Sequence, residues 1–334
     1  MTPGAAMDLY LEHRRDEVVA ETLRSHEARI SKFVEWCDAE GITNINDLDG
    51  RTLHAFRVHR REEAGLKPVT LQGQLSTLRQ FLRVCAAMDA VPENLHEKIL
   101  LPTVGKGQGT DDTQLPAGRA KAILEYLGTY EYASVQHVTL LLAWRTSARR
   151  GGLRALDLGD FDQEDDALEF RHRPATDTPL KNGEWGERDV ALLKGVADVL
   201  RDYINGPRHT VQDEHGRAPL ITTQRGRPSV STIQSWVYRV TRPCVIGEPC
   251  PHDRDPDTCE AMRSDLASKC PSSRSPHQVR TGSVTTFLDE GTPKAILSDR
   301  VDMTEDVMDE HYDQGTKREK MHRRQEYLRG GDGS

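Results

Sequence analysis

Five residues in the second half of the chain could together cut a phosphodiester bond without a metal ion. They are, in sequence order, Arg149, Lys181, His277, Arg280 and Tyr312. Two guanidiniums could bind the non-bridging oxygens of a phosphate, an imidazole could accept a proton, and an ammonium could protonate a departing alkoxide. A phenol could attack phosphorus and form a covalent intermediate. The set therefore contains each group that such a cleavage needs.

The chemistry and the position of each residue suggest a role for it. Tyr312 lies in MDEHYDQ, at the end of a predicted helix, and only about one phenol in a thousand is ionised at neutral pH, so it needs a base. His277 titrates in the working range and could be that base. Arg280, three residues later, shares its helix face, and Arg149 would bring a second guanidinium to the same phosphate. Lys181, at a predicted hairpin turn, could protonate the leaving 5′-oxygen.

Each of these residues is common when taken alone. A tyrosine near a helix end is usually half-buried, and isolated arginines and turn lysines are usually solvated. A His-x-x-Arg pair also occurs by chance in many helices. The five residues in this order, with a strand-turn-strand pattern around the lysine and a helical domain in front, are much more specific. We therefore favour the catalytic interpretation.

The first hundred residues predict a small all-helical domain. Apolar residues recur at helical spacing in three segments, at 21–42, 52–61 and 71–85. Residues 101–116 follow, rich in Gly, Pro, Thr and Asp and without periodicity, which is typical of an interdomain linker. We expect a helical domain over 1–100 and a linker over 101–116.

The remainder, residues 117–330, predicts a second domain that is mainly α with a small antiparallel β-sheet. Helical periodicity dominates, but residues 167–173 and 187–193 alternate in the manner of strands, and turn residues lie between them. Lys181 falls in this turn. The hairpin would therefore present the lysine at its tip.

Length and composition limit the class of protein. The chain has 334 residues, enough for two domains with separate cores, and a formal net charge of −8. A negative total does not exclude a basic face that binds nucleic acid. The chain has neither an apolar run of membrane-spanning length nor a signal peptide, so we expect a soluble, cytoplasmic protein without a membrane partner. In that reducing compartment, the cysteines are expected to be thiols or metal ligands.

A cysteine-rich insert at 244–270 precedes the His-x-x-Arg pair. It contains few apolar residues that could form a core of its own. Four cysteine thiolates could instead bind a structural Zn²⁺, which would stabilise the insert and the helix that follows it. None of the spacings is the short Cys-x-x-Cys of a standard zinc finger, and unrelated thiols in a loop account for the pattern equally well. The candidate ligands are Cys244, Cys250, Cys259 and Cys270, with His252 as an extra candidate.

The order and the flanking residues of the five candidates resemble the tyrosine recombinase (phage integrase) family. TSARRGGLRALDLGDFD is similar to the first arginine box of that family and matches its catalytic arginine at Arg149. HQVR is similar to the second box at His277 and Arg280, and EHYD matches the nucleophile at Tyr312. The helical domain in front resembles the SAM-like core-binding domain. The resemblance covers nearly the whole chain.

This resemblance implies an enzyme that breaks and rejoins DNA strands, a site-specific recombinase or integrase. It implies a C-shaped clamp on double-stranded DNA, a 3′-phosphotyrosyl intermediate on Tyr312, a free 5′-hydroxyl, and strand exchange in a synaptic homotetramer. The bond energy stays in the covalent link, so no cofactor is implied for catalysis.

The sequence departs from the family pattern at two positions. Gly152 stands where the first box often has an acidic residue that orients the arginine, and Met303 stands at the position of a second His or Trp, with Arg300 nearby. A non-catalytic DNA-binding regulator on the same scaffold is therefore one alternative. A zinc-dependent nuclease or regulator centred on the cysteine insert is the other.

Overall fold

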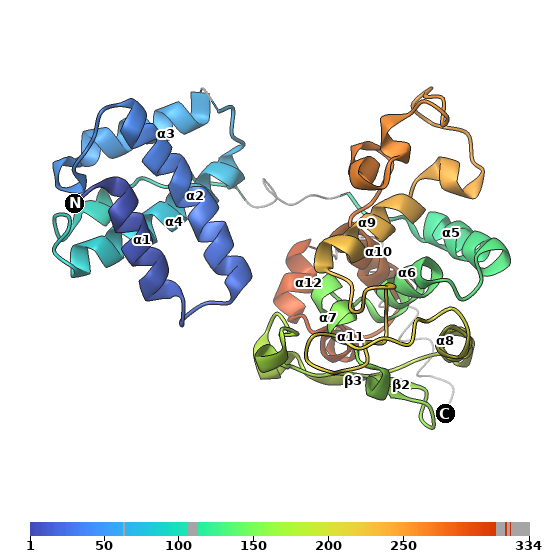
Figure 1. Ribbon diagram of the computed structural model, residues 1–334. Coiled ribbons are helices and arrows are strands. Elements are labelled where there is room, and N and C mark those ends of the chain that lie inside the picture. Colours follow the sequence, from blue (N-terminus) through green and yellow to red (C-terminus); the bar gives the residue numbers. More distant parts are fainter. Residues whose placement is uncertain (63, 106–112, 312–317, 319–320, 322–334) are drawn as a thin grey trace. The chain divides into compact units, whose positions relative to one another are not determined.

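The chain divides into two compact units, Met1–Asp111 and Asp112–Ser334 (Figure 1). The boundary lies inside the segment that the sequence marks as a linker. The structure, a computed structural model, describes residues 1–62, 64–105, 113–311, 318 and 321.

The first unit is entirely helical over its described residues. The three helices that periodicity predicts are confirmed as α2, α3 and α4, and their apolar faces meet in an aromatic core in which Phe33 packs edge-on against Phe56 and Phe81. The elements of this unit are α1 (Pro3–Arg14), α2 (Ala20–Ala39), η1 (Ile45–Asp47), α3 (Gly50–Glu62), α4 (Pro68–Ala87) and η2 (Leu95–Lys98).

Helix α1 does not follow from the sequence pattern, because few of its residues are large and apolar. Its start is nevertheless well defined, since the Thr2 hydroxyl accepts a hydrogen bond from the Ala5 amide at 3.2 Å and Pro3 occupies the first turn. The helix buries Ala6 and Tyr10, and the Tyr10 ring lies edge-on to Phe81 with ring centroids 5.6 Å apart. Tertiary packing, rather than a continuous apolar stripe, holds α1 in place.

The buried Tyr10–His26 pair should make the stability of the first unit depend on pH. The Tyr10 hydroxyl and His26 Nδ1 share a hydrogen bond of 2.8 Å, and burial, with Arg14 and Arg29 nearby, lowers the pKa of His26. The unfolded chain then binds the proton more readily, so the free energy of unfolding should fall as pH drops below about 6.5, the ordinary value for histidine. Urea denaturation from pH 7.5 to 5 should show a weaker decline for His26→Asn. An equal decline would contradict this origin.

The second unit is built around helix α6, which contacts α5, α7, α8, α9 and α10. The residues of α6 are buried on nearly all sides, which explains the unbroken apolar run of its sequence. The helices of this unit are α5 (Ala117–Tyr130), α6 (Val135–Thr146), α7 (Arg150–Ala155), α8 (Lys194–Asn205), α9 (Val230–Val240), α10 (Pro276–Asp289), α11 (Lys294–Val301) and α12 (Glu305–His311). No helix of the described residues is long and apolar enough to cross a membrane.

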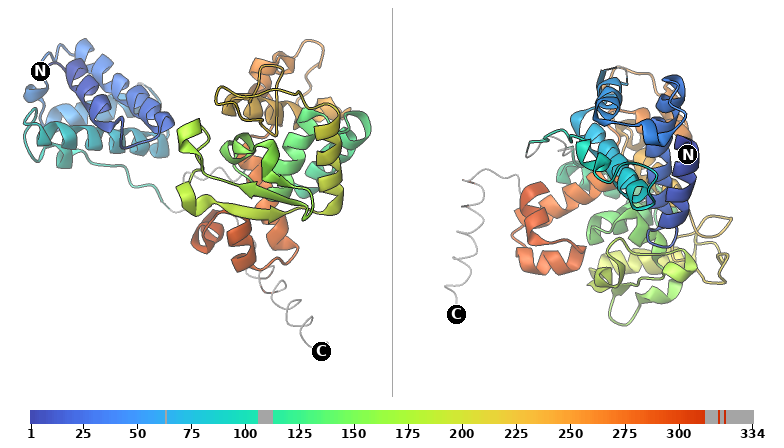
Figure 2. Two further views of the ribbon diagram at one scale, coloured as in Figure 1. Left: turned by 60° about the horizontal axis from the view of Figure 1, so that its bottom comes forward. Right: turned by 90° about the vertical axis from the view of Figure 1, so that its left-hand side faces the viewer.

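A three-stranded antiparallel sheet lies against these helices (Figure 2). Its strands are β1 (Phe161–Asp162), β2 (Ala167–Phe170) and β3 (Arg188–Ala191), paired in that order. The strands are shorter than the alternation suggests, and residues 171–187 form a longer loop than the predicted turn. The small sheet confirms the predicted fold class, and the loop carries Lys181.

Helix α10 is fixed by a close approach at Gly282. A Cβ atom on Gly282 would overlap the carbonyl oxygen of Leu115, so only glycine fits. The Leu115 amide also donates to the carbonyl of Gln278 at 3.0 Å, and Ser275 and Gln278 form a capping box at the start of the helix. The segment that enters the second unit therefore packs directly on the helix that carries His277 and Arg280.

Candidate active site

Arg280 joins two distant segments of the second unit. Its side chain is almost completely buried, with 2% of the residue exposed. Nη1 donates to the carbonyl of Ser147, and Nη2 donates to the carbonyl of Val301 at 2.7 Å. The guanidinium thus fixes the loop before α7 to the end of α11.

Arg149 lies at the start of α7, two residues after the carbonyl that Arg280 holds. Ser147 adopts a left-handed conformation (φ 50°), and its hydroxyl lies 2.6 Å from that of Ser283 on α10. Arg149 Nη1 pairs with Asp302 Oδ2 at 2.5 Å, and Arg280 Nη2 lies 3.5 Å from the carbonyl oxygen of Asp302. The structure therefore brings both predicted arginines to one place.

The Lys181 loop reaches the same place through the neighbouring residue. Lys181 is exposed, and Asn182 Nδ2 donates to Asp302 Oδ1 at 2.7 Å. Gly183, with φ 63°, lets the loop turn back toward β3. The loop that carries Lys181 is thereby held to the aspartate that pairs with Arg149.

Among the described residues, no hydrogen bond or ion pair joins His277 to the arginines or to the lysine loop, and the predicted nucleophile lies outside the described part of the chain. His277 is exposed in the first turn of α10, one helical turn before Arg280. Tyr312 lies outside the described residues, directly after α12, which ends at His311. The structure therefore brings together the two arginines and the lysine loop, and it places His277 on the same helix as Arg280.

Two further arginines, Arg188 and Arg300, add positive charge close to Arg149. Arg188 on β3 donates to the carbonyls of Arg300 and Gly186, both at 2.9 Å. Burial lowers the pKa of Arg188 to about 10; Asp302 opposes this effect, whereas Arg149 and Arg300 add to it. The group remains charged at neutral pH. In the sequence, Arg188 could have been singled out by its place in the second predicted strand, directly after the loop that carries Lys181.

The structure shows what surrounds Met303 and Gly152, the two residues that depart from the family pattern. Met303 is 8% exposed and packs in a small core with Val301 and Met308, so it acts as an apolar core residue. Arg300 does not replace it, because its guanidinium donates to the carbonyls of Ala191 and Arg145, both at 3.0 Å. Gly152 faces the Phe170 ring, which would lie 3.5 Å from a Cβ at that position.

The cysteine insert surrounds a buried arginine. Arg242 donates to the carbonyls of Arg239 and Ala261, and burial raises the pKa of the neighbouring Cys244 thiol, an effect to which Cys270 and Cys250 add. Among the described residues, which include all the candidate ligands, no three His, Cys, Asp or Glu side chains are grouped so that they could hold a metal. The structural zinc stays a prediction of the sequence, which metal analysis of the purified protein tests.

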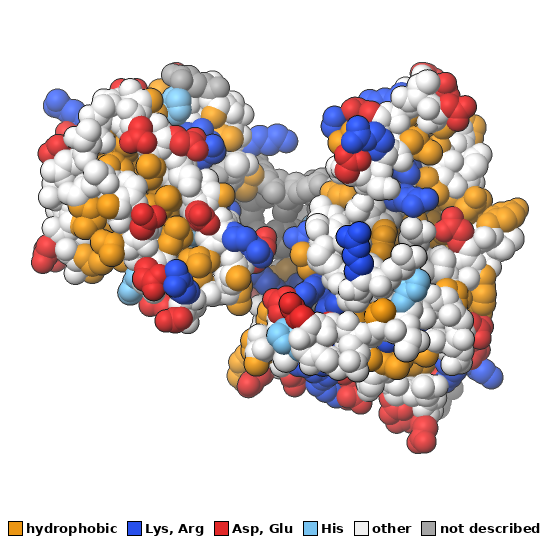
Figure 3. Space-filling model, viewed as in Figure 1, with side chains coloured by type: hydrophobic (Ala, Val, Ile, Leu, Met, Phe, Trp, Pro, Cys, Tyr) orange, Lys and Arg blue, Asp and Glu red, His pale blue; other side chains and the backbone are white. Residues whose placement is uncertain are grey.

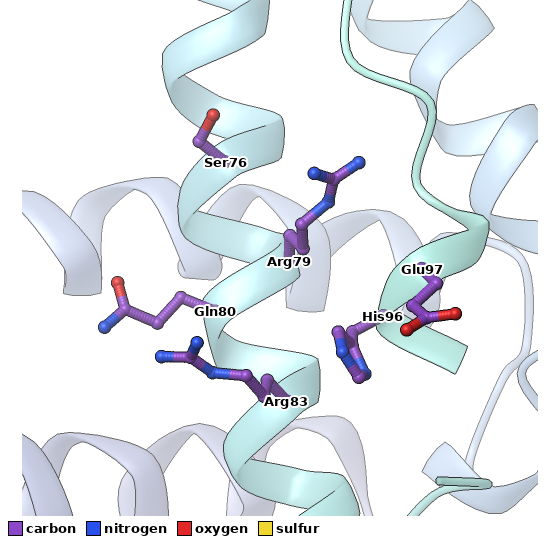
Figure 4. A pocket seen from close by; sticks show the side chains of 6 residues that line it. All are labelled: Ser76, Arg79, Gln80, Arg83, His96 and Glu97. Carbon is purple, nitrogen blue, oxygen red and sulfur yellow. The ribbon is translucent and has the colours of Figure 1, made fainter. Parts of the chain in front are cut away.

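The first unit has a polar pocket of about 530 Å³ between α4 and η2 (Figure 4). Arg79 and Arg83 project from successive turns of α4, and His96 and Glu97 lie opposite on η2. Arg79 Nη2 donates to the carbonyl of Ile99, whereas Arg83 is exposed. On the face shown in Figure 3, acidic and basic side chains are scattered over both units, without a uniformly basic surface.

The family model of the phage integrase N-terminal SAM-like domain matches residues 7–87. This part of the chain belongs to that family. An N-terminal domain of a phage integrase/site-specific recombinase from Haloarcula marismortui is 34% identical over 30% of this chain and 97% of its own, with a TM-score of 0.30. No curated protein matches the sequence significantly.

The whole chain has the fold of solved integrases. The Tn1549 transposon integrase in complex with a circular intermediate DNA is 14% identical, aligns over 98% of this chain and 99% of its own, and has a TM-score of 0.66. A lambda integrase dimer bound to a COC′ core site is also 14% identical, over 95% of this chain and 100% of its own, with a TM-score of 0.62. The resemblance to the tyrosine recombinase family is confirmed at the level of fold.

Proposed function

We propose that the protein is a site-specific DNA recombinase or integrase that cuts and rejoins strands through a 3′-phosphotyrosyl intermediate on Tyr312. The observation that carries the proposal is the convergence of Arg149 and Arg280, which lie on different segments of the chain and both contact Asp302. Two guanidiniums at one place could bind the two non-bridging oxygens of a phosphodiester, which share its negative charge. The fold of the chain, shared with integrases that were solved on DNA, supports this assignment.

In the proposed reaction, the Tyr312 oxygen forms a bond to phosphorus as the bond from phosphorus to the 5′-oxygen breaks. His277 accepts the phenolic proton, and Lys181 gives a proton to the departing 5′-oxygen. Arg149 and Arg280 balance the charge that develops on the non-bridging oxygens, with their positions fixed in advance by Asp302 and by the backbone carbonyls that Arg280 binds. Attack by a 5′-hydroxyl on the phosphotyrosine reverses these steps and joins the strands.

The proposed partner is double-stranded DNA, bound by a homo-oligomer. A lambda integrase tetramer bound to a Holliday junction shares the fold, with 14% identity and a TM-score of 0.62. We propose a similar tetramer for strand exchange in this protein. Symmetric closed assemblies are the usual form of such oligomers.

A nicked suicide substrate tests the proposal. The nick lets the short 5′-hydroxyl fragment diffuse away, so the covalent protein–DNA adduct accumulates. Because no metal takes part in the proposed chemistry, the adduct should form in EDTA and be visible as a shifted band after denaturing electrophoresis. Because the target sequence is unknown, the nicked substrates are prepared from a set of genomic DNA fragments. A full set of fragments that yields binding without any adduct would instead favour the non-catalytic regulator.

The pocket on α4 supplies a prediction about DNA binding. We expect Arg83 to contact a phosphate, so Arg83→Ala should weaken binding about equally for all DNA sequences and reduce the slope of log affinity against log salt by about 1. Fluorescence anisotropy over a range of salt concentrations measures both. Arg24→Ala is the matched control, since Arg24 is an exposed arginine on α2 paired with Glu21 at 2.8 Å. Equal effects of the two variants would count against the pocket.

A further inference from the structure

Asp302 contacts three of the segments that carry the proposed catalytic groups. Its side chain is 11% exposed, and both carboxylate oxygens are engaged. Oδ2 pairs with Arg149 Nη1 at 2.5 Å, and Oδ1 accepts from Asn182 Nδ2 at 2.7 Å. Its carbonyl oxygen lies 3.5 Å from Arg280 Nη2. One residue thus links the first arginine, the lysine loop and the second arginine.

The position of Asp302 is unfavourable for a carboxylate unless its partners are present. The residue follows the last turn of α11, where the partial negative charge of the helix end repels an anion. Its backbone is left-handed (φ 52°), a conformation that favours glycine and that aspartate only tolerates. Arg149 pairs with the carboxylate, and Arg188 lies close enough to interact with it electrostatically. The placement therefore indicates that the carboxylate serves the groups that it binds.

We propose that Asp302 is a positioning residue that orients Arg149 and holds the Lys181 loop beside it. This inference rests on the proposed recombinase function. Gly152, in the next turn of α7, has no side chain that could hold the arginine, and its position faces Phe170 instead. A guanidinium has five N–H groups, so a carboxylate on Nη1 fixes its plane and still lets the fork bind a phosphate. Asp302 thereby replaces a partner that the first arginine box lacks.

The same contact could have the opposite effect, because a carboxylate on Arg149 could compete with the phosphate of DNA. The two roles predict opposite results. A positioning carboxylate speeds strand cleavage, so neutralising it slows the reaction. A competing carboxylate must leave before DNA binds, so neutralising it tightens binding and speeds cleavage.

The test is Asp302→Asn in the full-length protein with a saturating nicked suicide substrate. We expect adduct formation in a single turnover to be about 10- to 100-fold slower, since small errors in the position of a catalytic group have effects of this size. The dissociation constant for DNA should stay the same or decrease, because a negative charge is removed. Asp299→Asn is the matched control, an exposed aspartate three residues earlier on α11, and should match the wild type. A rate for Asp302→Asn at or above the wild-type rate overturns the inference.

A second measurement separates orientation of Arg149 from general stabilisation of the fold. If Asp302 acts through Arg149, Asp302→Asn should slow Arg149→Lys little further, because the fork that it orients is already gone. A loss that persists in full in the Arg149→Lys background indicates a structural role and overturns the inference. If the wild type itself forms no adduct, the recombinase proposal fails and this inference falls with it. If the wild type forms the adduct and Asp302→Asn forms it at the same rate, the recombinase proposal stands and only the inference about Asp302 fails.

Discussion

Tyr312→Phe should abolish the covalent protein–DNA adduct while leaving DNA binding intact. The substitution removes the oxygen that is proposed to form the bond to phosphorus, and none of the other proposed site residues has a hydroxyl group that could replace it. We expect a loss of at least about 10⁴-fold, since groups that act as a unit in covalent catalysis have effects of this order. Denaturing electrophoresis of the suicide-substrate reaction measures the adduct, and a mobility shift measures binding.

Tyr327→Phe is the matched control, because Tyr327 lies in the same C-terminal tail. This variant should form the adduct at the wild-type rate. An adduct that persists in Tyr312→Phe and disappears in Tyr327→Phe would move the nucleophile to the second tyrosine. Activity that chelation abolishes and Tyr312→Phe leaves unchanged would instead support the zinc-centred alternative, provided that the chelated protein remains folded.

Arg280→Lys should give the second large effect, on cleavage and on stability together. Lysine keeps a positive charge but cannot reach the carbonyls of Ser147 and Val301 with the geometry of the guanidinium. Cleavage should fall by about 10²- to 10³-fold, as expected for one preorganised donor to a transition-state oxyanion. A buried carbonyl left without its partner costs about 1–3 kcal/mol, so the free energy of unfolding should fall by that order.

Arg242→Lys is the control for the stability effect. Arg242 is also 2% exposed and also donates to backbone carbonyls, but it lies beside the cysteine insert. This variant should lose stability and retain single-turnover cleavage at a temperature at which it remains folded. If both variants lose cleavage only in proportion to the unfolded fraction, Arg280 has a structural role alone.

The sequence predicts the elements whose residues are regular in spacing or strongly apolar. Helix α4 follows from the recurrence of leucines, and the buried helix α6 follows from its unbroken apolar run. The strands around the lysine loop follow from alternation. Helix α1 does not, because Ala6 and Tyr10 gain their burial from tertiary contacts that have no periodic signal. The extent of the loop at 171–187 is also missed, since short 3₁₀ turns within it carry no clear pattern.

The candidate site shows a similar division. The types and order of its residues indicate Arg149, Lys181, His277 and Arg280, because the chemistry restricts which side chains can serve. Asp302 carries no such signal: its importance comes from the turn at the end of α11, which places a carboxylate beside residues far away in the chain. The sequence indicates that Arg149 lacks an acidic partner at position 152, and only the fold reveals that Arg149 pairs with Asp302.

The overlap that any side chain at Gly282 would make with Leu115 has a mechanical consequence. Leu115, just before α5, lies against Gly282 and donates a hydrogen bond to the carbonyl of Gln278, so the start of the second unit is fixed to α10. Any displacement of residues 113–115 should therefore move the helix that carries His277 and Arg280.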